Sequence, residues 1–86
     1  MYTIFSTDTC KWCVLAKNLM NKNNMQFTEL NIPQNISKEE FGVMVEEYGV
    51  RLTVPKIFIG ERLIGGYEDL VEYIDNELGG YGEGKL

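Results

Sequence analysis

The chain has 86 residues, of which 44% are hydrophobic and 24% charged, and it carries a net charge of −5 with no histidine. This length supports one small domain with a single modest core. The acidic charge argues against nucleic-acid binding, which normally needs a basic surface, and the lack of histidine excludes Cys–His catalysis and mixed Cys/His zinc sites. No apolar stretch is long enough to cross a membrane and no leader begins the chain, so we expect a protein of the reducing cytoplasm.

The chain begins with a predicted strand and helix. Residues 2–5 form a short β-type run. From Trp12 the apolar residues recur with the period of a helix, which ends at the polar residues 21–24. One face of this helix is predicted to carry Trp12, Leu15, Ala16 and Leu19.

A second strand and helix follow. Residues 26–32 alternate as a strand does, and Pro33 ends the run. Ser37 and Glu40 have the spacing of a capping box, which begins a helix, and Gly49 is a suitable stop. The apolar face of this second helix is predicted to comprise Phe41, Met44, Val45 and Tyr48.

The last predicted elements are a hairpin and a third helix. Residues 56–59 and 62–64 read as strands joined by Gly60-Glu61, a link that fits a type II′ turn. Gly65-Gly66 then opens a helix whose apolar side is predicted to carry Leu70, Val71, Ile74 and Leu78.

The predicted order is therefore β-α-β-α-β-β-α, an α/β domain over residues 1–78 followed by a flexible glycine-rich tail at residues 79–86. Two strands that flank a helix run parallel with a right-handed crossover, whereas a hairpin is antiparallel. A four-stranded mixed sheet flanked by helices accommodates both.

Two cysteines lie two residues apart in the stretch TDTCKWCVL, residues 7–15. Cys10 falls where the first strand has ended and the first helix begins, and Cys13 lies about one turn inside that helix. The free N–H groups and the dipole of a helix start favour a thiolate, the reactive form of cysteine. Lys11 favours it too, whereas Asp8 opposes it. We expect Cys10 to be an exposed nucleophile and Cys13 to be the thiol that resolves its mixed disulfides.

The residues alone leave other interpretations of this pair open. Two buried core cysteines, or a chance CxxC, need no chemistry, although the position at a helix start favours a redox pair. A zinc site needs four ligands, and two sulfurs without imidazole cannot form a self-contained one. We therefore expect no metal, with a site shared between two chains still open.

Together with two later motifs, the cysteine pair resembles the dithiol glutaredoxins, in particular compact bacterial or phage members. The motifs are Thr53-Val54-Pro55 and Gly65-Gly66-Tyr67-Glu68-Asp69, and the resemblance covers residues 1–78. CxxC alone is shared with thioredoxins, whereas the three motifs at these spacings are more specific. The resemblance implies a thioredoxin-like fold and a thiol–disulfide oxidoreductase with glutathione as co-substrate.

The resemblance also implies a glutathione site. Pro55 would be cis and would present the backbone of Val54 beside the thiols, where glutathione or a peptide adds as a short strand. At the start of the third helix, Glu68 would supply a backbone N–H and Asp69 a carboxylate to the γ-glutamyl end of glutathione. The residues implied are Lys11, Trp12, Arg51, Thr53, Val54, Pro55, Gly66, Tyr67, Glu68 and Asp69.

The chain departs from the glutaredoxin pattern near the thiols. Lys11-Trp12 stands where these proteins often have Pro-Tyr, so Trp12 keeps an aromatic wall while proline is lost. Thr7 stands where many members have a lysine for the glycyl carboxylate of glutathione. Arg51 or Lys11 would have to substitute for that lysine.

We therefore expect a monomer that reduces protein disulfides and glutathione mixed disulfides in the cytoplasm, or in the host cytoplasm if the source is viral. Ribonucleotide reductase is the client that the resemblance suggests. Two alternatives stay open: a redoxin reduced by thioredoxin reductase, and a dimeric module that holds a [2Fe–2S] cluster through Cys10 and two glutathiones.

Overall fold

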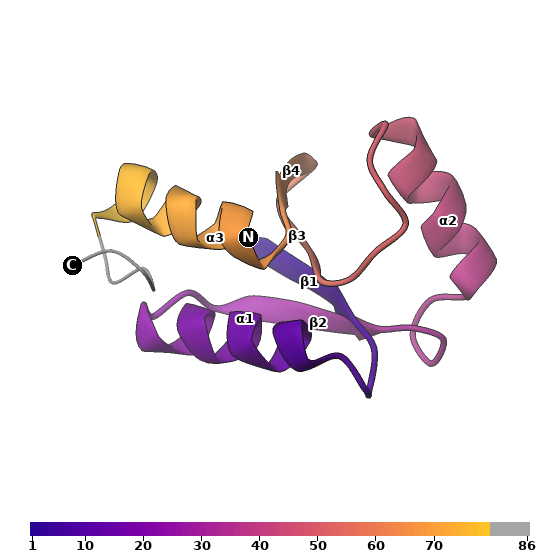
Figure 1. Ribbon diagram of the computed structural model, residues 1–86, viewed down its shortest axis with the longest axis horizontal. Coiled ribbons are helices and arrows are strands. Elements are labelled where there is room, and N and C mark those ends of the chain that lie inside the picture. Colours follow the sequence, from indigo (N-terminus) through magenta and orange to yellow (C-terminus); the bar gives the residue numbers. More distant parts are fainter. Residues whose placement is uncertain (80–86) are drawn as a thin grey trace.

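The computed structural model describes residues 1–79 of the chain. Its elements follow the predicted β-α-β-α-β-β-α order (Figure 1). They are β1 (Tyr2–Ser6), α1 (Lys11–Lys22), β2 (Phe27–Asn31), α2 (Lys38–Glu47), β3 (Lys56–Ile59), β4 (Arg62–Gly65), α3 (Tyr67–Tyr73) and the π-helical turn η1 (Ile74–Leu78), which continues α3.

The four strands form one mixed sheet in the order β2-β1-β3-β4. β1 pairs in parallel with β2, to which α1 connects it, and antiparallel with β3. β3 and β4 form an antiparallel hairpin. This is the mixed sheet expected from the sequence. β1 and β3 lie at its centre, so the loops at their ends are held by the most buried strands.

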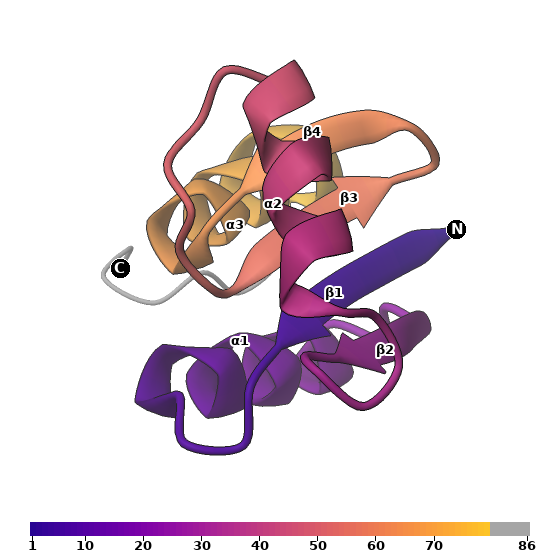
Figure 2. The ribbon, with the colours of Figure 1, turned by 90° about the vertical axis from the view of Figure 1, so that its right-hand side faces the viewer.

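The helices cover both faces of the sheet. Figure 2 shows α2 in front of the sheet, with α1 and α3 behind it. The side chains of the central strands alternate between the two faces: Ile4 and Ile57 pack with α1 and α3, whereas Phe5 and Phe58 pack with α2. Each face therefore has its own apolar cluster, and α1 and α3 share one of them.

All three predicted apolar faces are wrong in part. Tyr48, expected on the face of the second helix, lies just after α2 and is 40% exposed, although its ring contacts that of Phe58. The buried stripe of α1 is Cys13, Ala16, Leu19 and Met20. Trp12 is 52% exposed because the stripe begins one residue later and Trp12 lies against Tyr67 at the surface. Leu78 is 44% exposed because the last turn is π-helical, which rotates it away from the stripe of α3.

Glycines with positive φ lie in the turn between β3 and β4 and after the end of α2. Gly60 has a φ of 59° and Glu61 is not among the residues with positive φ, the combination that a type II′ turn requires. Gly49, with a φ of 67°, follows α2 as its predicted stop. Gly65 differs from expectation, because it ends β4 rather than opening the next helix.

Two proline peptides are cis: Val54–Pro55, as expected, and Ile32–Pro33, which the sequence did not indicate. Within residues 1–79 no helix has the length and apolarity that a membrane crossing requires. The predicted tail at residues 79–86, apart from Gly79, lies outside the described residues.

Candidate active site

Cys10 is the N-cap residue of α1. Its backbone is extended, and its Sγ accepts a hydrogen bond of 3.1 Å from the N–H of Cys13. The side chain thus occupies the position where serine or aspartate usually satisfies a free N–H of the first turn. Cys10 is partly exposed, whereas Cys13 is completely buried, and neither is in a disulfide.

The environment of Cys13 keeps it protonated. Burial, followed by the hydrogen bond with Cys10, raises the pKa of the Cys13 thiol from 9.0 to about 12, against smaller opposing effects of the Thr7 backbone and Lys17. At neutral pH Cys13 is therefore a neutral thiol. One sulfur of the pair is accessible and the other is buried and neutral.

The loop before β3 faces the exposed thiol. The carbonyl oxygen of Val54, which precedes the cis proline, lies 3.7 Å from the Sγ of Cys10 and can accept its S–H. The N–H of Val54 makes no hydrogen bond within residues 1–79. An edge of free backbone therefore lies beside Cys10, which is what an extended peptide needs in order to add as a strand.

The start of α3 depends on two adjacent glycines. The N–H of Gly66 donates a 3.0 Å hydrogen bond to Oδ2 of Asp69, which completes a cap without a side chain at Gly66. Gly65 has a φ of 128°, and a Cβ on it would overlap the Asp69 carboxylate. Glycine at position 65 therefore lets Asp69 fold back onto the start of α3.

The loop before β3 and the start of α3 meet in one cleft of about 380 Å³, here called the Trp12 cleft. The rings of Trp12 and Tyr67 are 5.5 Å apart and join α1 to α3 across it, and the amine of Lys11 lies 5.9 Å from the Trp12 ring. The walls are Trp12, Thr53, Val54, Pro55, Gly66, Tyr67, Glu68 and Asp69. A hollow of about 410 Å³ at the other end of α1 has no charged side chain in its lining: Asn21, Asn24, Met25, Gln26 and Phe27.

The resemblance implies an exposed thiol and a buried one beside a cleft that a cis proline and the start of a helix line, and this is the geometry found. The glutaredoxin family model matches residues 2–64. The chain belongs to the glutaredoxin family.

Individual relatives agree with this assignment. Glutaredoxin 3 of Escherichia coli K12 is 42% identical over 67 residues, which cover 78% of this chain and 77% of that protein. The crystal structure of glutaredoxin 1 from Francisella tularensis, complexed with cacodylate, has a TM-score of 0.75 at 30% identity and covers 92% of this chain and 96% of that one. The holo form of glutaredoxin C1 from Populus tremula x tremuloides has a TM-score of 0.78 at 28% identity, with coverage of 90% and 77%.

The chain is therefore a thiol–disulfide oxidoreductase with a thioredoxin-like fold. Within residues 1–79, no group of three or more histidine, cysteine, aspartate and glutamate side chains is placed to hold a metal ion.

A second cleft, of about 340 Å³, adjoins the first and is called here the Thr7 cleft. It shares Thr53 and Val54 with the Trp12 cleft, and its only cation is Lys38 from the start of α2. Arg51 and Lys11, the two candidates to replace the family lysine, line neither cleft. The walls of the Thr7 cleft are Thr7, Ile32, Pro33, Lys38, Phe41, Leu52, Thr53 and Val54.

Sequence reasoning missed Lys56, the first residue of β3. Its side chain is 5% exposed, and its amine donates to the carbonyl oxygen and the hydroxyl of Thr53, which lines both clefts. A lysine at the start of a strand usually indicates an exposed end. The one available signal was its place directly after the cis proline.

Proposed function

We propose that this glutaredoxin uses glutathione to reduce protein disulfides and glutathione mixed disulfides through Cys10 and Cys13. The observation that carries the proposal is the Trp12 cleft, which runs from the free backbone of Val54, beside the Cys10 sulfur, to the start of α3. An exposed thiol, a peptide edge and a helix start match the three parts of a γ-glutamyl tripeptide with a central cysteine.

In the first step, the Cys10 thiolate attacks one sulfur of the substrate disulfide. A new S–S bond forms, the old one breaks, and the departing thiolate takes a proton from solvent. The attacking sulfur lies at the N-cap of α1, where it accepts the Cys13 N–H at 3.1 Å.

In the second step, Cys13 loses its proton to solvent and attacks the Cys10 sulfur, which releases the reduced substrate and leaves a Cys10–Cys13 disulfide. Once Cys10 is in a mixed disulfide, it can no longer carry the negative charge that helps to raise the pKa of Cys13. Cys13 is thus easier to ionise after the first step than before it. Two glutathione molecules then restore the dithiol and form glutathione disulfide.

Glutathione is proposed to span both clefts. Its cysteinyl part would pair with the Val54 backbone, and its γ-glutamyl end would lie on the first turn of α3 beside Asp69. Its glycyl carboxylate would extend into the Thr7 cleft, where Lys38 supplies the positive charge that Thr7 lacks. Lys38 would then take the role first expected of Arg51 or Lys11.

We further propose that the protein acts as a monomer in the cytoplasm and that ribonucleotide reductase is one of its clients. Cys10 is accessible in the single chain, and the Trp12 cleft is complete without a second copy. The client proposal rests on the family alone, and turnover of a purified ribonucleotide reductase with this protein as electron donor tests it.

A coupled assay tests the proposed function. NADPH consumption is followed with a glutathionylated peptide, using either glutathione with glutathione reductase or thioredoxin reductase alone. We expect turnover with the first system only. Turnover with thioredoxin reductase alone would replace the proposal by the redoxin alternative. Visible absorbance in an anaerobically purified dimer, without reductase activity, would replace it by a [2Fe–2S] module.

A further inference from the structure

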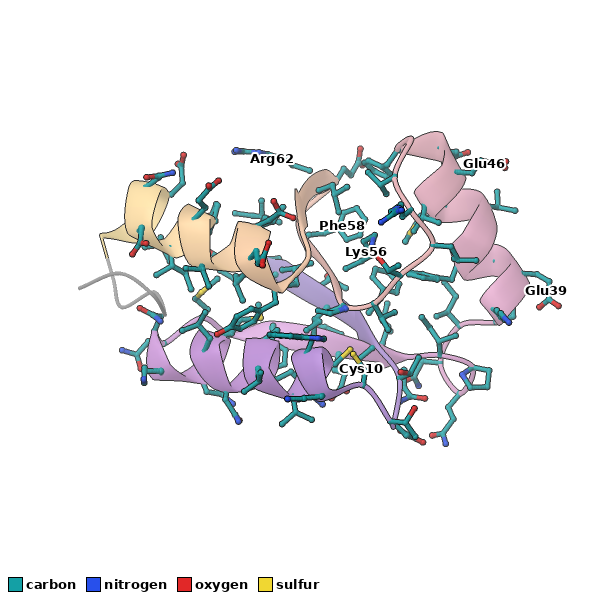
Figure 3. The ribbon with its side chains drawn as sticks, viewed as in Figure 1. Cys10, Glu39, Glu46, Lys56, Phe58 and Arg62 are labelled. Atoms are coloured by element: carbon teal, nitrogen blue, oxygen red, sulfur yellow. The ribbon has the colours of Figure 1, made fainter. Side chains whose placement is uncertain are left out.

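Lys56 is a buried cation directly behind the loop that forms the shared wall of the two clefts. Its amine donates hydrogen bonds of 2.9 Å to the carbonyl oxygen of Thr53 and 2.7 Å to the hydroxyl of Thr53. Figure 3 shows Lys56 on one side of this loop and Cys10 on the other in that view. The same loop presents Val54, whose carbonyl oxygen reaches the Cys10 sulfur.

Stability does not explain a lysine at this position. Lys56 pairs with Phe5 across the central strands, and burial lowers the pKa of its amine against the attraction of the Asp69 carboxylate. A charge in such a place is costly, and an apolar side chain of similar volume is often neutral or better. Thr53 itself is exposed, so water could satisfy its carbonyl and hydroxyl without Lys56.

The Lys56 side chain interacts with two residues that line the Trp12 cleft. Thr53 is held directly by the two hydrogen bonds, and it is adjacent in the chain to Val54. Asp69, which also lines the cleft at the start of α3, interacts electrostatically with the Lys56 amine. The amine does not line either cleft, so it does not touch a ligand bound there.

We infer that Lys56 is a positioning residue: it fixes Thr53 from behind, so that the Val54 backbone is held in place for the substrate beside Cys10. The inference rests on the proposed glutathione-dependent function. Fixing a binding edge before the substrate arrives lowers the entropy that binding must overcome. Loss of Lys56 therefore weakens substrate binding and leaves the sulfur chemistry of Cys10 intact.

The test is the steady-state kinetics of Lys56→Met with a glutathionylated peptide, at saturating glutathione. We expect KM for the peptide to rise about five- to tenfold and kcat to stay within about twofold. The rate at which iodoacetamide alkylates Cys10 should not change, and the thermal midpoint should be equal or higher. Lys22→Met, which removes an exposed lysine at the end of α1, controls for the lost charge and should keep the wild-type KM.

A folded Lys56→Met protein with unchanged KM overturns the inference. So does a lower thermal midpoint with equal losses in kcat and alkylation rate, because that is the result of a merely structural role. If the methionine variant does not fold, Lys56→Leu, which also lacks a donor to Thr53, is judged by the same KM criterion. Absence of glutathione-linked turnover in the wild type overturns the proposed function instead, so the two failures are distinguishable.

Discussion

α1 and α2 begin with the same capping geometry, which serves reactivity in α1 and stability in α2. At α2, the Oγ of Ser37 accepts the N–H of Glu40 at 3.0 Å, and the Glu40 carboxylate accepts in return from the Ser37 N–H. At α1, the Sγ of Cys10 accepts the N–H of Cys13 at 3.1 Å, and no acidic residue lies in the first turn.

The comparison shows which feature makes one helix start reactive and the other structural. The capped N–H is nearly the same distance from its acceptor in both helices, so the local fold does not distinguish them. What differs is the acceptor atom and its surroundings. At α2 the acceptor is a hydroxyl oxygen in an exposed capping box, whereas at α1 it is a sulfur that faces the Val54 carbonyl beside the Trp12 cleft. The two starts should therefore respond oppositely to substitution, one in activity and the other in stability.

The largest expected effect is that of Cys10→Ser. Serine is a good N-cap, so the free energy of unfolding should change little, while the loss of the only exposed thiol in residues 1–79 should lower the rate of disulfide exchange by about 10³-fold or more. Denaturant titration and the coupled assay measure the two quantities. Residual activity near a tenth of wild type would mean that Cys10 is not the nucleophile.

Cys13→Ser should separate two activities. Reduction of a protein disulfide needs the resolving thiol and should fall about 100-fold, whereas exchange with a glutathionylated peptide needs Cys10 alone and should stay within about threefold. Both rates are measured with glutathione and glutathione reductase. Loss of both activities in a folded Cys13→Ser protein would exchange the roles of the two cysteines, because both reactions begin with the nucleophile.

The start of α3 can be disturbed through Gly65→Ala. A Cβ there overlaps the Asp69 carboxylate, and the φ of 128° is unfavourable for alanine. We therefore expect the free energy of unfolding to fall by about 1–3 kcal/mol. KM for the glutathionylated peptide should rise with it, because Asp69 is displaced from the cleft. Gly42→Ala is the matched control: nothing lies within 4 Å of its Cβ, and it should stabilise α2 by about 0.5–1 kcal/mol. Unchanged KM in Gly65→Ala would remove Asp69 from the proposed site.

The sequence predicted the element order, the sheet and most of the cleft, because these follow from local periodicity, caps and glycines. It did not predict the exposure of Trp12, since both Trp12 and Cys13 fit a helical stripe and only packing against Tyr67 decides between them. It also missed Lys56, because the burial of a strand-end lysine depends on how the preceding turn at Thr53 folds back and on the pairing with Phe5, which periodicity does not reveal. Arg51 was placed by distance along the chain, which does not fix the direction of an exposed side chain.

The raised pKa of Cys13 predicts a loss of stability at alkaline pH. Its pKa is 9.0 unfolded and about 12 folded, so the native state binds the proton more tightly. Its stabilising contribution is complete below pH 9 and is lost as the pH rises toward 12, by about 1.4 kcal/mol at pH 10. The hydrogen bond with Tyr2 raises the pKa of Tyr73 to about 12, so Tyr73 also loses stabilising energy at alkaline pH.

The test compares wild type with Cys13→Ser in denaturant titrations from pH 8 to 10.5. The contribution of Tyr73 is the same in both proteins and therefore cancels in the difference. Parallel pH curves for the two proteins would contradict the buried, neutral state of Cys13.

The smallest effect on activity is expected at the other helix start. Ser37→Ala removes both the acceptor for the Glu40 N–H and one donor to the Glu40 carboxylate, and it should cost about 1 kcal/mol of unfolding free energy. It should leave kcat and KM unchanged, because α2 packs on the face of the sheet opposite to α1 and α3. Ser37→Asp, which restores an N-cap acceptor, should recover the stability. A rise in KM without a loss of stability would show instead that the α2 start acts on the Thr7 cleft through the adjacent Lys38, and the contrast between the two helix starts would then hold only for α1.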